Sequence, residues 1–257
     1  MVVVPDLDEI LDFCAQAPVE RVLLEDVARR GLGRFVGVRT NGALSALCHV
    51  GANIVPAGEG CEAFAWRALD GRARMMVGGE AAIGALWDAM RVQLLPPRDD
   101  RPGQPVYEIS DPPIAGGTGL RLATADDLPL LVPACAAAHA EELGVDPMDE
   151  DGDTFRWRTR SQIEEGRSWV WRERDTILFK AEASAWTPSA VQVQQVWVDP
   201  SVRGHGYAQR GMRDLCVLLL RKVPHVCLFV RPENAAAIRV YEAIGMRRAL
   251  MFRSIIF

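Results

Sequence analysis

A glycine-rich segment with one arginine lies where a strand is expected to end and a helix to begin. The segment reads Arg203-Gly204-His205-Gly206-Tyr207-Ala208. Glycines let a backbone approach a ligand closely, and the first turn of a helix presents N–H groups that have no partner within the helix. With an arginine beside it, this arrangement suits the binding of a pyrophosphate. A structural glycine-rich turn is the alternative, and the segment by itself leaves both interpretations open.

The strand before this loop has an interrupted apolar pattern. Apolar Val191 and Val193 flank the polar Gln192, but the next pair of valines at this spacing is Val196 and Val198, so Gln194-Gln195 shifts the phase by one residue. Such a slip predicts a β-bulge, which would separate the strand from its neighbour and leave backbone groups free for an extended ligand. A strand buried on both faces is the alternative, which Trp197 favours.

These segments must be positioned by the elements around them. From residue 120 onward we expect strands at 120–123, 168–172, 176–185, 191–198, 225–230 and 250–257. Helices are expected after a capping box at Thr124 and Asp127, and at 153–165, 207–222 and 235–244. The alternation of the two kinds of element predicts an α+β (mixed α/β) domain with a central mixed sheet, splayed at the bulge and flanked by helices.

The first part of the chain predicts a smaller α+β domain. Its expected elements are a helix at 18–30, a hairpin of strands 34–39 and 43–50 around Asn41-Gly42, a helix at 62–69, a strand at 73–77 and a helix at 80–90. The proline- and glycine-rich stretch 96–119 favours a linker, with a short strand at 106–109. We therefore divide the chain into an N-terminal domain (1–110), a linker (111–119) and a C-terminal domain (120–257).

The charge, hydropathy and cysteine content of the chain exclude several classes of function. The formal net charge of the 257 residues is -5, which does not favour binding to nucleic acid. No apolar run approaches the roughly 20 residues of a membrane helix, and the first residues do not resemble a signal peptide, so we expect a cytoplasmic protein with no membrane partner. The six cysteines form no CxxC pair and no cluster with histidine, so no metal is expected.

The segment from Val196 to Ala208, followed by a helix, a strand, Asn234 and the run Tyr241-Glu242-Ala243-Ile244-Gly245-Met246, resembles the GNAT acetyltransferase superfamily. The family motif Arg/Gln-x-x-Gly-x-Gly/Ala maps onto Arg203, Gly206 and Ala208. The whole chain resembles a two-part subgroup in which a domain of unknown function precedes the GNAT domain. The order of hairpin, strand and glycine-led helix in the N-terminal domain loosely echoes the second half, which predicts a degenerate GNAT-like half. Since it shows no Arg-x-x-Gly-x-Gly loop, we expect it not to bind coenzyme A.

The resemblance implies that acetyl-CoA is the co-substrate and that several residues bind it. The loop amides of Arg203, Gly204, His205, Gly206, Tyr207 and Ala208 would hold the pyrophosphate, backbone groups of Val196 and Val198 would pair with the pantetheine arm, and Asn234 would hydrogen-bond it. Tyr241 would protonate the departing thiolate as general acid. Asn234 as a helix N-cap and Tyr241 as a core aromatic are the structural alternatives.

An acceptor amine must lose a proton before it attacks, so a general base is needed. Glu182 is our first candidate, because a charge inside an otherwise apolar strand requires a reason. Glu141 and Glu142, at the end of the first helix of the second domain, are the other candidates. Each of these carboxylates could equally be a solvated surface group.

The sequence thus predicts an acetyl-CoA-dependent N-acetyltransferase that acts by direct attack through a tetrahedral intermediate. A non-catalytic acyl-CoA sensor or partner-binding protein on the same fold is the alternative, and a scaffold with a vestigial loop is a third. The acceptor, an amine-bearing small molecule or peptide, stays unidentified, and a homodimer is left open.

Overall fold

The computed structural model describes residues 2–68 and 73–257, and the strands of these residues form one twelve-stranded sheet. The N-terminal half contributes β1 (Val2–Val3), β2 (Arg34–Thr40), β3 (Ala43–Val50), β4 (Asn53–Gly58), β5 (Met75–Gly79) and β6 (Asp99–Ile109). The C-terminal half contributes β7 (Arg121–Leu122), β8 (Ser168–Glu173), β9 (Thr176–Trp186), β10 (Ala190–Val198), β11 (His225–Phe229) and β12 (Arg247–Ile256).

Helices connect the strands in the same order in both halves. The N-terminal half contains α1 (Leu7–Ala15), α2 (Val22–Arg29), η1 (Cys61–Phe64), α3 (Ala65–Ala68), α4 (Glu80–Met90) and η2 (Arg91–Gln93). The C-terminal half contains η3 (Ala125–Asp127), α5 (Leu128–Leu143), α6 (Pro147–Glu164), η4 (Pro200–Val202), α7 (Tyr207–Leu220) and α8 (Ala235–Ala243). The helix expected at 62–69 is divided between η1 and α3, and Leu69 lies outside the described residues.

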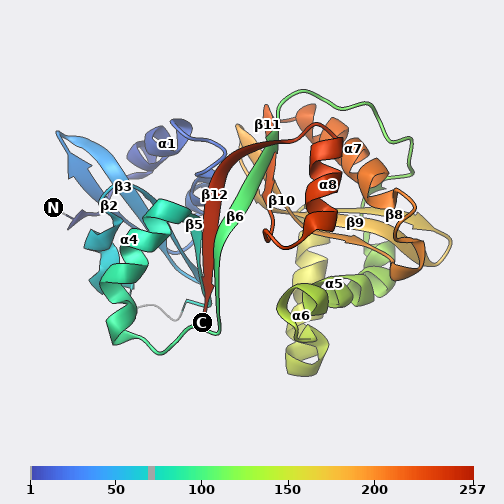
Figure 1. Ribbon diagram of the computed structural model, residues 1–257, viewed down its shortest axis with the longest axis horizontal. Coiled ribbons are helices and arrows are strands. Elements are labelled where there is room, and N and C mark those ends of the chain that lie inside the picture. Colours follow the sequence, from blue (N-terminus) through green and yellow to red (C-terminus); the bar gives the residue numbers. More distant parts are fainter. Residues whose placement is uncertain (1, 69–72) are drawn as a thin grey trace.

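The two halves exchange one strand each. The sheet order is β1-β2-β3-β4-β5-β12-β6-β11-β10-β9-β8-β7, so β12 lies between β5 and β6, and β6 lies between β12 and β11. Figure 1 shows these two long strands side by side in the middle of the molecule, with one half on either side. Each half is completed by a strand of the other, and the two share one continuous sheet.

The topology of the N-terminal half repeats that of the C-terminal half. In each half the fourth strand pairs in parallel with the fifth, β4 with β5 and β10 with β11, whereas the other neighbouring pairs are antiparallel. A helix pair joins the first strand to the second, and single helices follow the fourth and fifth strands. This is the order expected of a second GNAT-like half.

The core lies on both faces of the sheet. In the C-terminal half Trp169 and Trp171 pack with α7 and α8, while Val170 between them packs with α5. Helices α1 and α2 pack on strands of both halves, because their apolar cluster includes Ala185, Ala190 and Cys227. The halves are therefore joined by a common core as well as by the exchanged strands.

The stretch 96–119 differs from the expected linker. Its first part forms β6, an eleven-residue strand in the centre of the sheet, and not only a short strand at 106–109. The prolines are tolerated because register shifts interrupt the pairing of β6 with β12, and the Pro105 carbonyl still accepts a hydrogen bond from Val230 N–H at 3.2 Å. Residues 111–119 contain no helix or strand and run across the top of Figure 1.

Candidate active site

The bulge predicted in β10 is confirmed. Its register with β9 shifts twice, and Gln195 has a φ of 51° at the second shift. On the other side, the pairing of β10 with β11 ends at Gln192 and Cys227. The remaining residues of β10, up to Val198, therefore diverge from β11. This divergence leaves a gap in the sheet where backbone groups of β10, including those of Val196 in the bulge, lack a partner strand.

The glycine-rich loop closes one end of this gap. Gly204 and Gly206 have φ angles of 80° and 81°, a conformation that side-chain-bearing residues rarely adopt. No atom lies within 4 Å of the position that a Cβ would take at either glycine. No side chain caps the first turn of α7, which begins at Tyr207. The exposed loop thus presents an open approach to the N–H groups and positive dipole end of a helix.

The neighbouring loop residues have defined places. His205 is exposed and Ala208 is partly buried in the first turn of α7. The ring of Tyr207 stacks on Trp171 with a centroid distance of 4.8 Å, which fixes the start of the helix against the sheet. Arg203 Nε donates to the Val198 carbonyl at 3.0 Å, and its Nη2 lies 2.7 Å from Glu141 Oε1. Arg203 therefore joins the end of β10 to α5 in this structure.

Asn234 caps α8, as the structural alternative predicts. Its Oδ1 accepts a hydrogen bond from the Ala237 N–H at 3.1 Å. The side chain is exposed, and the structure gives its amide nitrogen no hydrogen bond. Cap and ligand-binding roles are compatible, because they use different atoms of the same amide.

Tyr241 lies on α8 and is only 6% exposed. Its ring packs against that of Tyr107 at 6.0 Å, and its hydroxyl has no hydrogen-bond partner among the described residues. Burial, followed by the charges of Glu142 and Cys216, raises the pKa of Tyr241 above its ordinary value. The phenol is consequently protonated at neutral pH, which is the state that a proton donor requires.

Glu182 has a different environment from the one expected of a free base. Its Oε1 lies 2.6 Å from Lys180 Nζ and accepts a hydrogen bond from Cys135 Sγ at 3.2 Å. Burial opposes the charge of the fully buried Lys180, but Glu182 and Cys135 outweigh it, so the pKa of Lys180 is raised. Because Glu182 is the counter-ion of a buried ammonium and accepts a hydrogen bond from a thiol of α5, its carboxylate is engaged beneath that helix.

The end of α5 lies over the bulge. Glu142 Oε2 accepts a hydrogen bond from Gln195 Nε2 at 2.7 Å, and Glu141 Oε1 accepts one from Trp197 Nε1 at 3.2 Å. Both glutamates are exposed. Glu142 is the carboxylate that contacts Gln195 of the bulge, and its charge contributes to the raised pKa of Tyr241.

The sequence analysis missed the polar residues around Glu142. Gln195 was read only as a break in the apolar pattern, although a polar side chain at a predicted bulge is itself an indication of a site. Arg98, Arg101 and Arg231 bind the end of α5 from distant parts of the chain, and no local pattern points to that contact.

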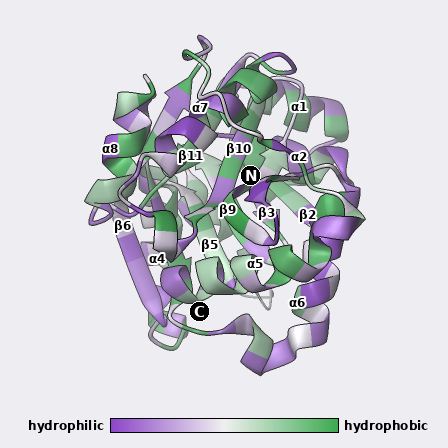
Figure 2. Cartoon of the chain, turned by 90° about the vertical axis from the view of Figure 1, so that its right-hand side faces the viewer, coloured by the Kyte–Doolittle hydropathy of each residue, from purple (hydrophilic) through white to green (hydrophobic). Residues whose placement is uncertain are grey.

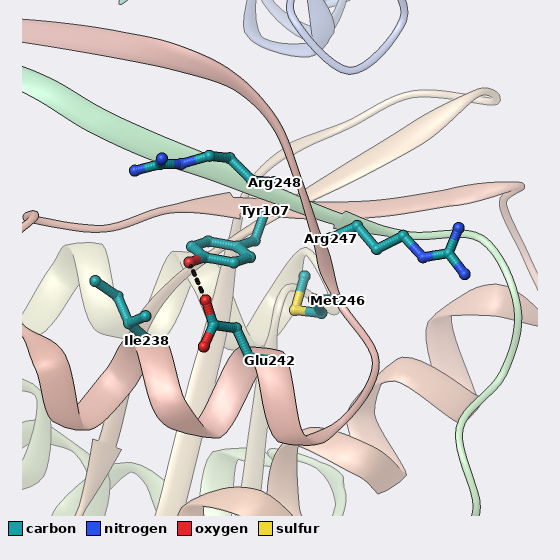
Figure 3. A pocket seen from close by; sticks show the side chains of 6 residues that line it. All are labelled: Tyr107, Ile238, Glu242, Met246, Arg247 and Arg248. Carbon is teal, nitrogen blue, oxygen red and sulfur yellow. Dashed lines mark hydrogen bonds between the residues drawn. The ribbon is translucent and has the colours of Figure 1, made fainter.

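A separate cavity lies away from the gap between β10 and β11. A cavity of about 480 Å³ between α8 and the strands β6 and β12 is lined by Tyr107, Ile238, Glu242, Met246, Arg247 and Arg248. The Tyr107 hydroxyl donates to Glu242 Oε1 at 2.9 Å across its floor, and the two arginines point away from each other (Figure 3). Since the cations do not converge, the geometry does not favour one anionic ligand there.

Comparisons with known proteins agree with this geometry. Residues 134–246 match the acetyltransferase (GNAT) family, and residues 33–131 match a domain of unknown function, DUF4081. The C-terminal half of the chain is a GNAT acetyltransferase domain, preceded by a DUF4081 domain. The GNAT match covers the bulge, the glycine-rich loop and Tyr241.

One curated relative is a mycothiol acetyltransferase of Brachybacterium faecium, 27% identical in a match that covers 44% of this chain and 44% of that protein. The chain thus spans less than half the length of this relative. Among solved structures, a GCN5-related N-acetyltransferase from Sphaerobacter thermophilus has a TM-score of 0.63 at 17% identity and covers 99% of this chain and 94% of that one. A tandem GNAT protein from the clavulanic acid biosynthesis pathway has a TM-score of 0.56 at 13% identity, covering 99% and 97%. At these identities the likeness shows the fold.

Two structural features are absent from the described residues. None of their helices is long and apolar enough to cross a membrane. Across 2–68 and 73–257, no three side chains of His, Cys, Asp or Glu are grouped to hold a metal ion.

Proposed function

We propose that the protein transfers the acetyl group of acetyl-CoA to the nitrogen of an amine. The observation that carries the proposal is the gap between β10 and β11, which has the open glycine-rich loop at one end and the buried Tyr241 on the adjoining helix. Family membership supports an acyltransferase, and the gap suits a long, extended donor.

The residues present fit acetyl-CoA. Gly204 and Gly206 leave room for phosphate oxygens above the loop, and the uncapped first turn of α7 supplies N–H donors from the segment 203–208. The pantetheine arm would pair with the backbone of Val196 and Val198, as an added strand does. The amide nitrogen of Asn234 would donate to the same arm.

Proton transfers define the roles of the side chains. Acetyl-CoA supplies an activated thioester. Glu142 takes a proton from the acceptor ammonium, whose nitrogen then attacks the thioester carbonyl carbon. A backbone N–H of the segment 196–198 stabilises the oxyanion of the tetrahedral intermediate. Tyr241 gives its proton to the sulfur as the C–S bond breaks, the nitrogen gives up its second proton to restore the phenol of Tyr241, and Glu142 releases its proton to water.

Glu142 replaces Glu182 in this proposal. The carboxylate of Glu182 is engaged by Lys180 at 2.6 Å, whereas the carboxylate of Glu142 is exposed and accepts a hydrogen bond from Gln195 at the bulge. A base must reach the acceptor nitrogen, and an accessible carboxylate at the gap meets that requirement better than a buried ion pair.

A calorimetric titration with acetyl-CoA tests the donor, with free CoA and buffer as controls. We expect saturable binding in the micromolar range, about -8 kcal/mol. Release of thiol in the presence of polyamines, aminoglycosides, amino acids, peptides or lysine side chains then identifies the acceptor. Binding without transfer to any amine would indicate the acyl-CoA sensor, and no binding up to millimolar concentration would refute the proposal.

The two candidate bases are separated by matched substitutions. Glu142→Gln should lower kcat by about 10²-fold or more and leave folding intact, because it removes an accessible base. Glu182→Gln should lower the melting temperature, because it leaves Lys180 buried without a counter-ion. The assignment fails if Glu142→Gln retains full kcat.

A further inference from the structure

Helix α5 ends in an electrostatically unfavourable way. Its last turn contains Glu141 and Glu142 and no basic residue. The C-terminal end of a helix carries partial negative charge and carbonyl groups without intrahelical partners, so carboxylates there are destabilising by about 0.3–1 kcal/mol each. The Ala140 carbonyl is satisfied by the Gly144 N–H at 2.8 Å, but the later carbonyls need donors from elsewhere.

Three arginines from outside the helix supply these donors. Arg98 Nη2 donates to the Leu143 carbonyl at 2.8 Å, and Arg101 Nη2 donates to the Glu142 carbonyl at 3.4 Å. Arg231, which follows β11, donates to the same Glu142 carbonyl. The guanidinium groups thus satisfy the terminal carbonyls and also offset the negative charge of the turn.

Two of the three arginines belong to the N-terminal half. Arg98 immediately precedes β6 and Arg101 lies on it. The side chain of Arg101 is only 12% exposed, and its Nε lies 2.6 Å from Asp99 Oδ2, so it is held in place. In Figure 2 this first part of β6 is the purple, hydrophilic length of the strand. The strand exchange brings it to the site, because β6 lies next to β11.

We propose that the N-terminal half takes part in the reaction through Arg98 and Arg101, which act as positioning residues. They fix the last turn of α5, and that turn holds Glu142 against Gln195 at the bulge. The inference rests on the role of Glu142 proposed above. It gives the DUF4081 half a function that needs no ligand of its own: it supplies one wall of the acceptor end of the site.

The double variant Arg98→Ala/Arg101→Ala tests this role in the full-length chain. Arg253→Ala is the matched control, because Arg253 pairs with Asp100 at 2.6 Å on the same two strands and has no contact with α5. We expect the double variant to lower kcat for the acceptor by about 10²-fold, as a displaced catalytic group does, with the acetyl-CoA Kd unchanged. Arg98→Lys/Arg101→Lys should recover most of kcat, since it restores the cations.

Hydrogen exchange of the peptide covering 140–146 adds a readout that needs no acceptor. Its amides should exchange about tenfold faster in the double alanine variant than in the wild type or in Arg253→Ala. Equal kcat in the double variant and in Arg253→Ala, or equal exchange of the turn, would overturn this inference while leaving the proposed function intact. Absence of acetyl-CoA binding by the wild type would overturn both.

Discussion

The two halves of the molecule share a topology and differ in what fills the space beside their fourth strand. In the C-terminal half this space is the gap between β10 and β11, and α8 packs mainly on α7. In the N-terminal half the pairing of β4 with β5 also ends early, at Ile54 and Met76. There, however, α4 packs onto β4 and η1, and the fully buried Phe64 and Leu86 share an apolar cluster with Ile54 and Met76.

The same contrast holds residue by residue. Tyr241 is the seventh residue of α8, and the seventh residue of α4 is Leu86. Asn234 caps α8, whereas Gly79 precedes α4 without a side-chain cap. The same fold therefore provides a candidate active site in the C-terminal half and a packed apolar core in the N-terminal half. The volume and polarity of the side chains at these positions determine the difference.

The largest expected effect concerns the strand exchange. Residues 111–257 expressed alone should not fold, because β11 and β12 would lose β6 between them and both would expose unpaired edges. Cleavage of the intact protein within 111–119 should instead leave both pieces associated on gel filtration. A folded, monomeric 111–257 fragment, judged by circular dichroism, would show that the halves are independent.

Equivalent helix positions should respond in opposite ways. Tyr241→Phe should lower kcat by about 10²–10⁴-fold with little change in stability, because it removes only the proton donor. Leu86→Ala should destabilise the protein by about 2–5 kcal/mol through the cavity it leaves, with kcat of the folded fraction retained. Thermal unfolding and steady-state kinetics of both variants measure the contrast, which disappears if Tyr241→Phe is fully active.

Glycines after the fourth strand of each half should also differ. In Gly206→Ala the new Cβ meets empty space, but the alanine must adopt a φ of 81°, so we expect a loss of about 1–2 kcal/mol of stability together with an affinity for acetyl-CoA that is about tenfold, or 1.4 kcal/mol, weaker. Gly58→Ala places a Cβ 2.2 Å from the Ser45 carbonyl oxygen, so its cost should be in stability. Calorimetry and melting temperature separate the two effects, and equal melting temperatures would contradict the difference.

The last contrast concerns the N-terminus of the first helix of each half. Asp127 is fully buried and bound by Arg121 at 2.7 Å and Arg172 at 2.9 Å, whereas Asp6 caps α1 on the surface. The hydrogen bond from Arg121 is the main cause of the lowered pKa of Asp127. Asp127→Asn should cost about 1.5–3 kcal/mol at pH 7, and Asp6→Asn about 0.5 kcal/mol.

The cost at Asp127 should depend on pH. Because its folded-state pKa lies below the unfolded value of about 3.9, the stabilisation is complete above that value and is lost as pH falls further. Urea unfolding of wild type and Asp127→Asn between pH 7 and pH 2 should therefore converge at low pH. A constant difference would show that the carboxylate charge is not the source.

The sequence by itself determined the local features of this protein. The Asn41-Gly42 hairpin, the Thr124–Asp127 capping box, the bulge at Gln194-Gln195 and the glycine-rich loop each follow from interactions between residues close together in the chain. The resemblance to the GNAT superfamily rested on the same short segments, which is why the family could be stated before the structure.

Only the tertiary structure decided how distant segments meet. The pairing of β6 with β12 joins residues more than a hundred positions apart, and proline-rich β6 has a pattern typical of a linker. Likewise, Glu182 is the expected base because it is a charged residue on an apolar strand, but its pairing with Lys180 appears only in the packed structure. The contacts of the arginines with the turn that contains Glu142 also depend on packing. The periodicity of apolar residues in the sequence predicts which residues share one face of a helix or strand. The contacts named here join different helices and strands, and the complete fold determines which of these lie side by side.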